Sequence, residues 1–236
     1  PLLSVITSIG WDHQEFLGET LPQIADEKAG IQKRGVPCIV GRQDDEALDV
    51  IEAKAARLGA PLLVHGQHWH VTSEHGRLVF QDETGLLDLP LPALPGPHQI
   101  ENAGIVIAAL RQLGHGEAVC EAALEDATWP ARLQRLTDHP LTSVAPNAEL
   151  WLDGGHNAGA GQALATAMAA MGGRPLWLIV GMMDRKDWTG FLAPFADLAA
   201  GLVAVPVPDQ SGGADPAEVA RAASDLSLAA TVAPTV

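Results

Sequence analysis

The chain alternates between two patterns of hydrophobic positions. Short apolar runs predict buried β-strands, and longer segments in which apolar residues recur every three or four positions predict amphipathic helices. Strands are predicted at residues 3–8, 36–40, 61–65, 149–152, 176–180 and 202–207. Helices are predicted at residues 20–29, 44–58, 100–113, 117–127, 158–171, 188–198 and 216–224. Because strands and helices alternate with short connections, we expect an α/β fold built on parallel sheets.

Local signals add detail to this pattern. Thr20 and Gln23 have the spacing of a capping box, which marks a helix start. Residues 69–89 alternate between apolar and polar side chains around turn signals at 74–76 and 83–85. This arrangement predicts antiparallel ribbons inserted into the strand–helix alternation.

The pattern restarts near residue 131, so we expect two domains, at residues 1–130 and 131–236. The sequence begins at Pro1 without a methionine and runs at once into an apolar segment, and residues 231–236 look like a strand or loop that is cut short. We therefore expect this sequence to be a piece of a longer protein in which both domains are incomplete.

Composition and charge narrow the class of protein. Of the 236 residues, 47% are hydrophobic, which supports a real core and excludes intrinsic disorder. The sequence contains 14 Lys and Arg and 29 Asp and Glu. The resulting net charge of −15 argues against nucleic acid or a membrane as a binding partner. No leader or long apolar run is evident, so we expect a cytoplasmic protein with Cys38 and Cys120 as reduced core residues.

Two polar features stand out in the first domain. Residues 10–13, Gly-Trp-Asp-His, follow the first predicted strand, and an imidazole and a carboxylate at a strand end can ligate a divalent cation; a helix cap with a surface histidine is the alternative. Lys28 lies on the stripe of Leu21, Ile24 and Ala25, where it is either snorkelling or desolvated. A desolvated neutral amine can react with carbon dioxide to form a metal-binding carbamate, whereas the simpler reading is a lysine well placed at a helix C-terminus.

The second domain offers two strand-end loops. In residues 153–157, Asp-Gly-Gly-His-Asn, the glycines let backbone approach a ligand and the helix start attracts anions, although Asp153 as an N-cap and His156 as a loop residue are the alternatives. Residues 181–187 form a second polar loop, which directly follows the next predicted strand, at 176–180. The glycines of residues 159–161 suggest a dinucleotide fingerprint that lacks its third glycine, which keeps a dinucleotide-dependent oxidoreductase as an alternative function.

Taken together, these strings resemble the folylpolyglutamate synthase/dihydrofolate synthase branch of the Mur ligase family. The matching strings are Ile-Thr-Ser-Ile-Gly-Trp-Asp-His at 6–13, Ile-Ala-Asp-Glu-Lys-Ala-Gly-Ile at 24–31, His-Gln-Ile-Glu-Asn-Ala at 98–103, Trp-Pro-Ala-Arg-Leu at 129–133 and Leu-Asp-Gly-Gly-His-Asn at 152–157. The resemblance implies that residues 1–130 are the C-terminal portion of a central ATP-binding domain. Residues 131–236 would be a Rossmann-like glutamate-ligase C-terminal domain.

The resemblance also implies roles for individual residues. Lys28 would be carbamylated and, with His13, would bind the metal. The remaining residues would contact ATP (Asn102, Arg132, Asp153), hold the incoming glutamate (His156) or belong to a further loop of the site (Asp184, Lys186). The implied cofactors are ATP and Mg²⁺, with a monovalent cation as a further candidate. The implied partners are the small-molecule substrates ATP, L-glutamate and dihydropteroate or folates, bound by a monomer.

The implied reaction joins L-glutamate to dihydropteroate or to a folate (poly)glutamate through an acyl phosphate, at the expense of ATP. The family's phosphate-binding loop precedes the part represented here, and no Gly-x-x-x-x-Gly-Lys-Ser/Thr occurs in this sequence. We therefore expect this chain alone to be inactive, and a split or decayed ligase acting as a binding module is the alternative. Ala131 and Ala158 stand where the family has glycine and proline.

Overall fold

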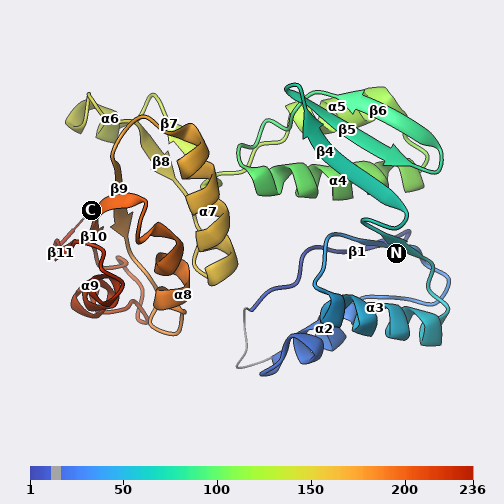
Figure 1. The fold of residues 1–236 in the computed structure, drawn as a ribbon, viewed down its shortest axis with the longest axis horizontal. Helices are drawn as coiled ribbons and strands as arrows, with labels where there is room; N and C mark the ends of the chain where they lie inside the picture. The colour runs from blue at the N-terminus through green and yellow to red at the C-terminus, as the bar shows by residue number, and fades with distance from the viewer. Residues whose placement is uncertain (12–16, 236) are drawn as a thin grey trace. The chain divides into compact units, whose positions relative to one another are not determined.

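The computed structural model describes residues 1–11 and 17–235 of the chain (Figure 1). They form two compact units, Pro1–Trp129 and Pro130–Val236. This division lies next to the boundary expected from the sequence, and the roles assigned to the two parts stay predictions. None of the helices in the described ranges is long and apolar enough to cross a lipid bilayer.

The first unit is built on a parallel sheet in the order β1-β2-β3, formed by Ser4–Ile6, Cys38–Val40 and Leu62–Val64. The parallel pairing confirms the α/β prediction, but each strand has three residues and is shorter than predicted. Pro37 and Pro61 explain where β2 and β3 begin. A proline has no N–H to donate, so the ladder starts after it, and the two prolines only accept bonds from the neighbouring strand.

Helices cover both faces of this sheet. The helices α2 (Leu21–Ala29) and α3 (Asp45–Leu58) share a buried core with one set of alternating strand residues, and α4 (Pro97–Gln112) shares another core with the opposite set. The predicted capping box of α2 is confirmed, because Thr20 Oγ1 accepts the Gln23 N–H and Gln23 Oε1 accepts the Thr20 N–H. The parallel sheet therefore lies between α2 and α3 on one face and α4 on the other.

A three-stranded antiparallel sheet packs on α4, as the turn signals predicted. Its strands are β4 (Trp69–Glu74), β5 (Arg77–Asp82) and β6 (Gly85–Leu89), and α5 (Glu117–Glu125) completes the layer. His75 and Gly76 both have positive φ, as a tight two-residue hairpin turn requires. Helix α4 begins three residues before its predicted start because Pro97 suits the first helical turn.

The second unit has its own parallel sheet in the order β9-β10-β11, with Leu176–Val180, Ala199–Ala204 and Ala230–Val232. The helices α7 (Ala158–Met171), α8 (Trp188–Leu192) and α9 (Pro216–Asp225) share a core with these strands. A small antiparallel pair, β7 (Gln134–Leu136) with β8 (Leu150–Leu152), and the short helix α6 (Pro140–Val144) precede them. The sequence pattern did not predict β7 or α6, which are only three and five residues long.

Two predicted elements in this unit have wrong bounds, and a proline lies at or just after the observed end of each. The helix predicted at 188–198 ends at Leu192 and tightens into a 3₁₀ turn at Ala193–Phe195, because Pro194 cannot supply the helical N–H. The strand predicted at 202–207 lies at Ala199–Ala204 instead, and Pro206 follows its end. The predicted bounds of α7 and β9 are confirmed residue for residue.

Candidate functional site

Polar side chains collect where the strands of the first parallel sheet end. Gln43, just after β2, ties down the segment after β1: its Nε2 donates to the Thr7 carbonyl at 2.8 Å, and its Oε1 accepts the Ile9 N–H at 3.0 Å. The Gln43 side-chain amide therefore bonds to the segment after β1 much as a backbone peptide group of a neighbouring strand would. Gln43 therefore fixes the course of residues 7–9, which precede Trp11 and the predicted site residue His13. His13 itself lies outside the described residues.

Lys28 lies in the last turn of α2, where a cation suits the helix dipole. Leu21, Ile24 and Ala25 are buried, but Lys28 is exposed, because Ala29 takes the buried position in the last turn. The residues that the structure describes therefore do not desolvate the Lys28 amine. The carbamate is still chemically reachable, and the role of Lys28 stays a prediction.

Asn102 is exposed on the second turn of α4. Its Nδ2 donates to Gln99 Oε1 at 3.1 Å, and Gln99 is buried. This contact orients the Asn102 amide, and the role of Asn102 in ATP binding stays a prediction. The neighbouring Glu101 forms an ion pair of 3.4 Å with Arg42, which follows β2.

His65 stands beside this ion pair, directly after β3. Burial lowers the pKa of His65 and the Arg42 guanidinium lowers it further, so the ring is neutral at neutral pH. The sequence pattern predicts no role for His65, Arg42, Gln43 or Glu101. The available signal was their position, since three follow strand ends and Glu101 lies near the start of α4.

In the second unit the carboxylate of Asp153 lies at the centre of a hydrogen-bond network. Its Oδ2 accepts the Leu133 N–H and its Oδ1 accepts the Gly155 N–H, both at 2.6 Å. A third bond, from the Gly154 N–H to the Ala131 carbonyl at 2.9 Å, joins the same two segments. Residues 131–133, here called the 131–133 turn, are thereby fastened to residues 153–157, the 153–157 loop.

This network places Arg132 and His156 on two joined segments. Both side chains are exposed. His156 Nδ1 lies 2.9 Å from the Gly154 carbonyl oxygen, a hydrogen bond that requires the proton on Nδ1 and leaves Nε2 as the acceptor of the neutral ring. Three residues predicted as a site, Arg132, Asp153 and His156, are thus gathered in this unit.

The helix that follows is capped by Asn157, whose Oδ1 accepts the Ala160 N–H at 2.9 Å. Asp153 is therefore not the N-cap of α7. Gly161 is buried, and a methyl group there would overlap the backbone carbonyl of Phe191 in α8. Gly161, one of the glycines that suggested a dinucleotide fingerprint, therefore allows close packing of α7 against α8.

The other predicted strand-end loop follows β9. The Asp184 N–H donates to the Gly212 carbonyl at 2.8 Å, and Met183 bridges to Gly213, so this loop is fastened to the segment before α9. Asp184 is exposed and Lys186 is half-buried. Their roles in ligand binding stay predictions.

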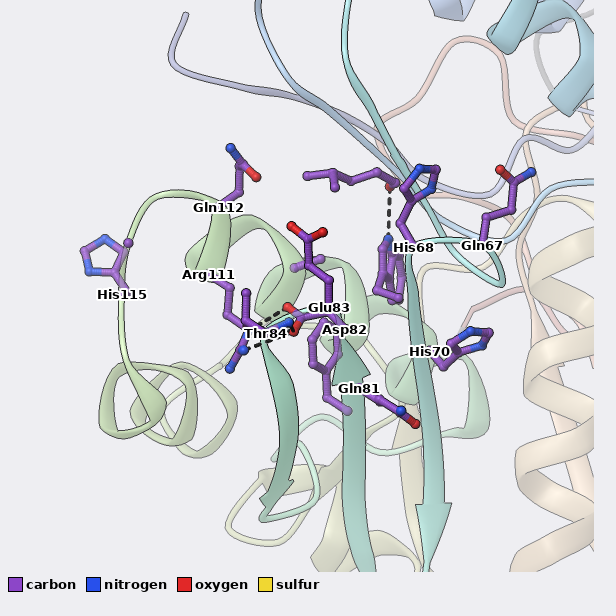
Figure 2. A pocket seen from close by; sticks show the side chains of 15 residues that line it. Gln67, His68, His70, Gln81, Asp82, Glu83, Thr84, Arg111, Gln112 and His115 are labelled. Atoms are coloured by element: carbon purple, nitrogen blue, oxygen red, sulfur yellow. Dashed lines mark hydrogen bonds and ion pairs between the residues drawn. The ribbon is translucent and has the colours of Figure 1, made fainter.

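A pocket of about 630 Å³ lies elsewhere, between β5, the end of α4 and the connection from β3 to β4 (Figure 2). Buried Trp69, Phe80 and Ala108 contribute apolar surface to it, and His68 and His115 are among its exposed polar residues. None of the predicted site residues that the structure describes lines this pocket. We therefore look for the candidate site in the strand-end loops of each unit, which carry the predicted residues.

Figure 2 also shows an ion pair at the edge of this pocket. Arg111 donates to both carboxylate oxygens of Asp82, at 2.7 and 3.0 Å, and the two side chains are only 18% and 15% exposed. Asp82 also accepts from the backbone N–H and the hydroxyl of Thr84. Asp82→Ala removes all four bonds and leaves Arg111 partly buried without its partner.

We expect Asp82→Ala to destabilise the first unit by about 2 kcal/mol, measured by urea unfolding of the chain. Asp88→Ala is the matched control, because Asp88 pairs with Arg77 on the surface, where such pairs contribute about 0–1 kcal/mol. Equal effects of the two substitutions would contradict the stabilising role of the Asp82–Arg111 pair.

No three His, Cys, Asp or Glu side chains in residues 1–11 and 17–235 lie together in a way that would hold a metal ion. Lys28 is the only member of the predicted metal pair within those ranges, since His13 is outside them. The described residues therefore do not by themselves form a divalent cation site, and the predicted Mg²⁺ site stays a prediction.

Comparison with known proteins places this geometry in a family. Residues 132–236 match the family described as Mur ligase, glutamate ligase domain. The folylpolyglutamate synthase of Lacticaseibacillus casei is 31% identical over 220 residues, which cover 88% of this chain and 49% of that protein. The dihydrofolate synthase/folylpolyglutamate synthase of Bacillus subtilis is 34% identical over 71% of this chain and 40% of that protein.

Solved structures agree with the sequence matches. Escherichia coli FolC, in complex with DHPP and ADP, superposes with a TM-score of 0.84 at 28% identity and covers 99% of this chain and 53% of its own. The bifunctional synthase of Yersinia pestis, complexed with AMPPNP and a Mn ion, gives 0.83 at 27% identity over 99% of this chain and 53% of its own. The chain spans about half the length of the curated relatives it matches. The chain has a Mur ligase fold and belongs to the folylpolyglutamate synthase/dihydrofolate synthase branch of the Mur ligase family.

Proposed function

We propose that this chain is part of an ATP-dependent ligase that adds L-glutamate to dihydropteroate, to a folate (poly)glutamate, or to both. The observation that carries the proposal is the 31% identity to a folylpolyglutamate synthase across 88% of the chain. Arg132, Asp153 and His156 also lie on two segments that are joined by hydrogen bonds, which supports the proposal.

The chemistry proceeds in two displacements. A carboxylate oxygen of the acceptor attacks the γ-phosphorus of ATP, the bond to the β-phosphate oxygen breaks, and ADP leaves with an acyl phosphate formed. The amine of L-glutamate then attacks the acyl carbon, phosphate leaves, and the nitrogen loses a proton to give the amide. Phosphorylation is needed because a free carboxylate is a poor acylating agent, and water must be excluded because it hydrolyses the acyl phosphate.

The residues of this chain would bind and orient the substrates. The exposed Arg132 guanidinium is a planar, bidentate donor suited to phosphate oxygens, and the Asn102 amide suits the base of the nucleotide. Asp153, the third residue that the resemblance assigns to the nucleotide, would act on ATP from the loop that is bonded to the 131–133 turn, which carries Arg132. His156, with Nε2 as its free acceptor, would receive a hydrogen bond from the ammonium or amine of glutamate. Carbamylated Lys28 with His13 would hold the divalent cation, and Asp184 and Lys186 would belong to a further ligand-binding loop of the second unit.

The test is a ligation assay with the product of the complete open reading frame that encodes this sequence. We expect release of ADP and phosphate that depends on L-glutamate and on dihydropteroate or a reduced folate, with one glutamate added per ATP. The 236-residue chain assayed alongside is expected to be inactive. Saturable ATP binding without turnover of any acceptor by the complete product would favour a non-catalytic binding module instead.

A Lys28→Ala substitution in the complete product is expected to lower kcat about 100-fold, because a charge-stabilising group at the phosphoryl transfer is lost. Lys33→Ala is the matched control: Lys33 follows the same helix, and its Nζ donates to the Gly30 carbonyl at 3.0 Å. It should change kcat less than twofold. The wild-type protein in ¹³C-bicarbonate should show a carbamate carbon signal that Lys28→Ala lacks. Full activity of Lys28→Ala would exclude the carbamate.

A further inference from the structure

The 131–133 turn has an unusual backbone. Ala131 has φ +54° and Leu133 has φ +44°, so two residues with side chains occupy the left-handed region that glycine favours. Between them Arg132 is exposed, whereas Leu133 is buried, 3% exposed. Such a turn persists only when its surroundings hold it.

The 153–157 loop supplies that hold. The two carboxylate oxygens of Asp153 accept the N–H groups of Leu133 and Gly155 at 2.6 Å each, and Ala131 accepts the Gly154 N–H at 2.9 Å. The pairing of Gln134 with Leu152 continues the contact along β7 and β8. Asp153 is the one side chain in this set that bonds to both segments, and its bonds to N–H groups are charge-assisted and short.

We propose that Asp153 is a positioning residue for Arg132: its carboxylate fixes the left-handed 131–133 turn and so aims the exposed guanidinium. The inference deepens the proposed function and rests on it in one respect, namely that Arg132 contacts the nucleotide phosphates. It differs from a direct nucleotide contact by Asp153, since here the effect of the carboxylate on ATP passes through Arg132.

The geometry alone permits both roles. A carboxylate has about four lone-pair sites, and the two backbone N–H groups occupy two of them. Asp153 is half-buried, so the remaining sites are partly open. An experiment must therefore ask whether the effect of Asp153 on ATP survives when Arg132 is gone.

The first measurement concerns the 236-residue chain without any ligand. We expect the amide hydrogens of both Leu133 and Gly155 to exchange at least tenfold faster in Asp153→Ala. In Asp153→Asn, which keeps one acceptor oxygen, we expect only one of these two amides to exchange at least tenfold faster. Asp215→Asn is the matched control, because Asp215 accepts a single N–H at the start of α9 and asparagine caps equally well. Fast exchange of both amides in the wild-type chain would overturn the proposal.

The second measurement is a double-mutant cycle on ATP affinity in the complete product, with a fluorescent ATP analogue as the probe. We expect Arg132→Ala and Asp153→Ala each to weaken the Kd about tenfold, and Asp153→Ala to weaken it less than twofold further when Arg132 is already alanine. Additive losses would show a direct contact and overturn the proposal. If Asp153→Ala does not fold, Asp153→Asn takes its place, with the same dependence on Arg132 expected.

A third variant tests the turn itself. Ala131→Gly removes a side chain from a left-handed position, so it should partly restore the ATP affinity of Asp153→Asn by at least twofold. No restoration would contradict the role of the strained turn. If the wild-type product binds no ATP, the proposed function fails, while protected Leu133 and Gly155 amides would still show that Asp153 holds the turn. The two failures are thus distinguishable.

Discussion

Gly161→Ala is expected to destabilise the second unit by about 3–4 kcal/mol, above the usual range for overpacking. The added methyl group would overlap the Phe191 carbonyl, and the Phe191 Cα and carbonyl carbon also lie 3.0 Å from its position. Backbone atoms cannot rotate out of the way as a side chain can. Helices α7 and α8 would have to separate, and Phe191, at 7% exposure, and Leu192, at 0%, would lose core contacts.

Gly159→Ala is the matched control, two residues earlier in the same helix. The nearest atom to its added methyl group is Asn157 Oδ1 at 3.7 Å, an ordinary contact. Alanine is the better helix former, so this variant should be neutral or stabilise by up to about 1 kcal/mol. Hydrogen exchange in urea, followed on peptides from α7 and α8, measures both variants. Equal stability of the two would mean that α7 and α8 do not approach closely at Gly161.

The same contact bears on the candidate site. Helix α7 begins directly after the 153–157 loop, so the position of its first turn sets where Asp153 and His156 lie. A helix displaced from α8 moves this loop relative to the 131–133 turn. We therefore attribute the glycine at position 161 to packing that supports the site.

Hydrophobic periodicity predicted the elements where nothing interrupts it. The bounds of α7 and β9 follow directly from the pattern, and the family resemblance, carried by ordered short strings, is confirmed. Periodicity failed where a local signal overrides it: Pro194 ends α8 early, and Pro206 follows the end of β10. Both prolines were readable in the sequence, and weighing them against the apolar pattern would have corrected the ends of the two elements, although not the earlier start of β10 at Ala199.

The site was harder to predict, because its decisive contacts join residues far apart in the chain. Asp153 was weighed as the cap of the helix just after it, but it bonds to Leu133, twenty residues earlier. Lys28 lies on the predicted apolar stripe yet is exposed, because Ala29, four residues after the buried Ala25, continues the buried face of the helix instead. The tie between Gln43 and the segment after β1 spans 36 residues at Thr7 and has no local signature.

Gly104→Ala is expected to destabilise the first unit by about 3 kcal/mol. Gly104 lies where α4 crosses β4, and an added methyl carbon would stand 2.6 Å from Val71 Cγ1 and 2.7 Å from Trp69 Cζ3. The indole cannot move aside, because it is 2% exposed and its Nε1 donates to the Leu63 carbonyl at 3.0 Å. The helix must lift from the sheet instead. Urea unfolding, followed by hydrogen exchange on peptides from α4 and β4, measures the loss.

Gly116→Ala serves as the control in the same unit. Gly116 precedes α5 with φ −89°, and no atom lies within 4 Å of an added methyl group, so the cost should not exceed about 0.5 kcal/mol. Because Asn102 lies half a turn before Gly104, a lifted α4 should also weaken ATP binding by the complete product severalfold, whereas Gly116→Ala should not. A stable Gly104→Ala variant with unchanged ATP affinity would contradict both the close packing of α4 and the proposed place of Asn102 at the nucleotide.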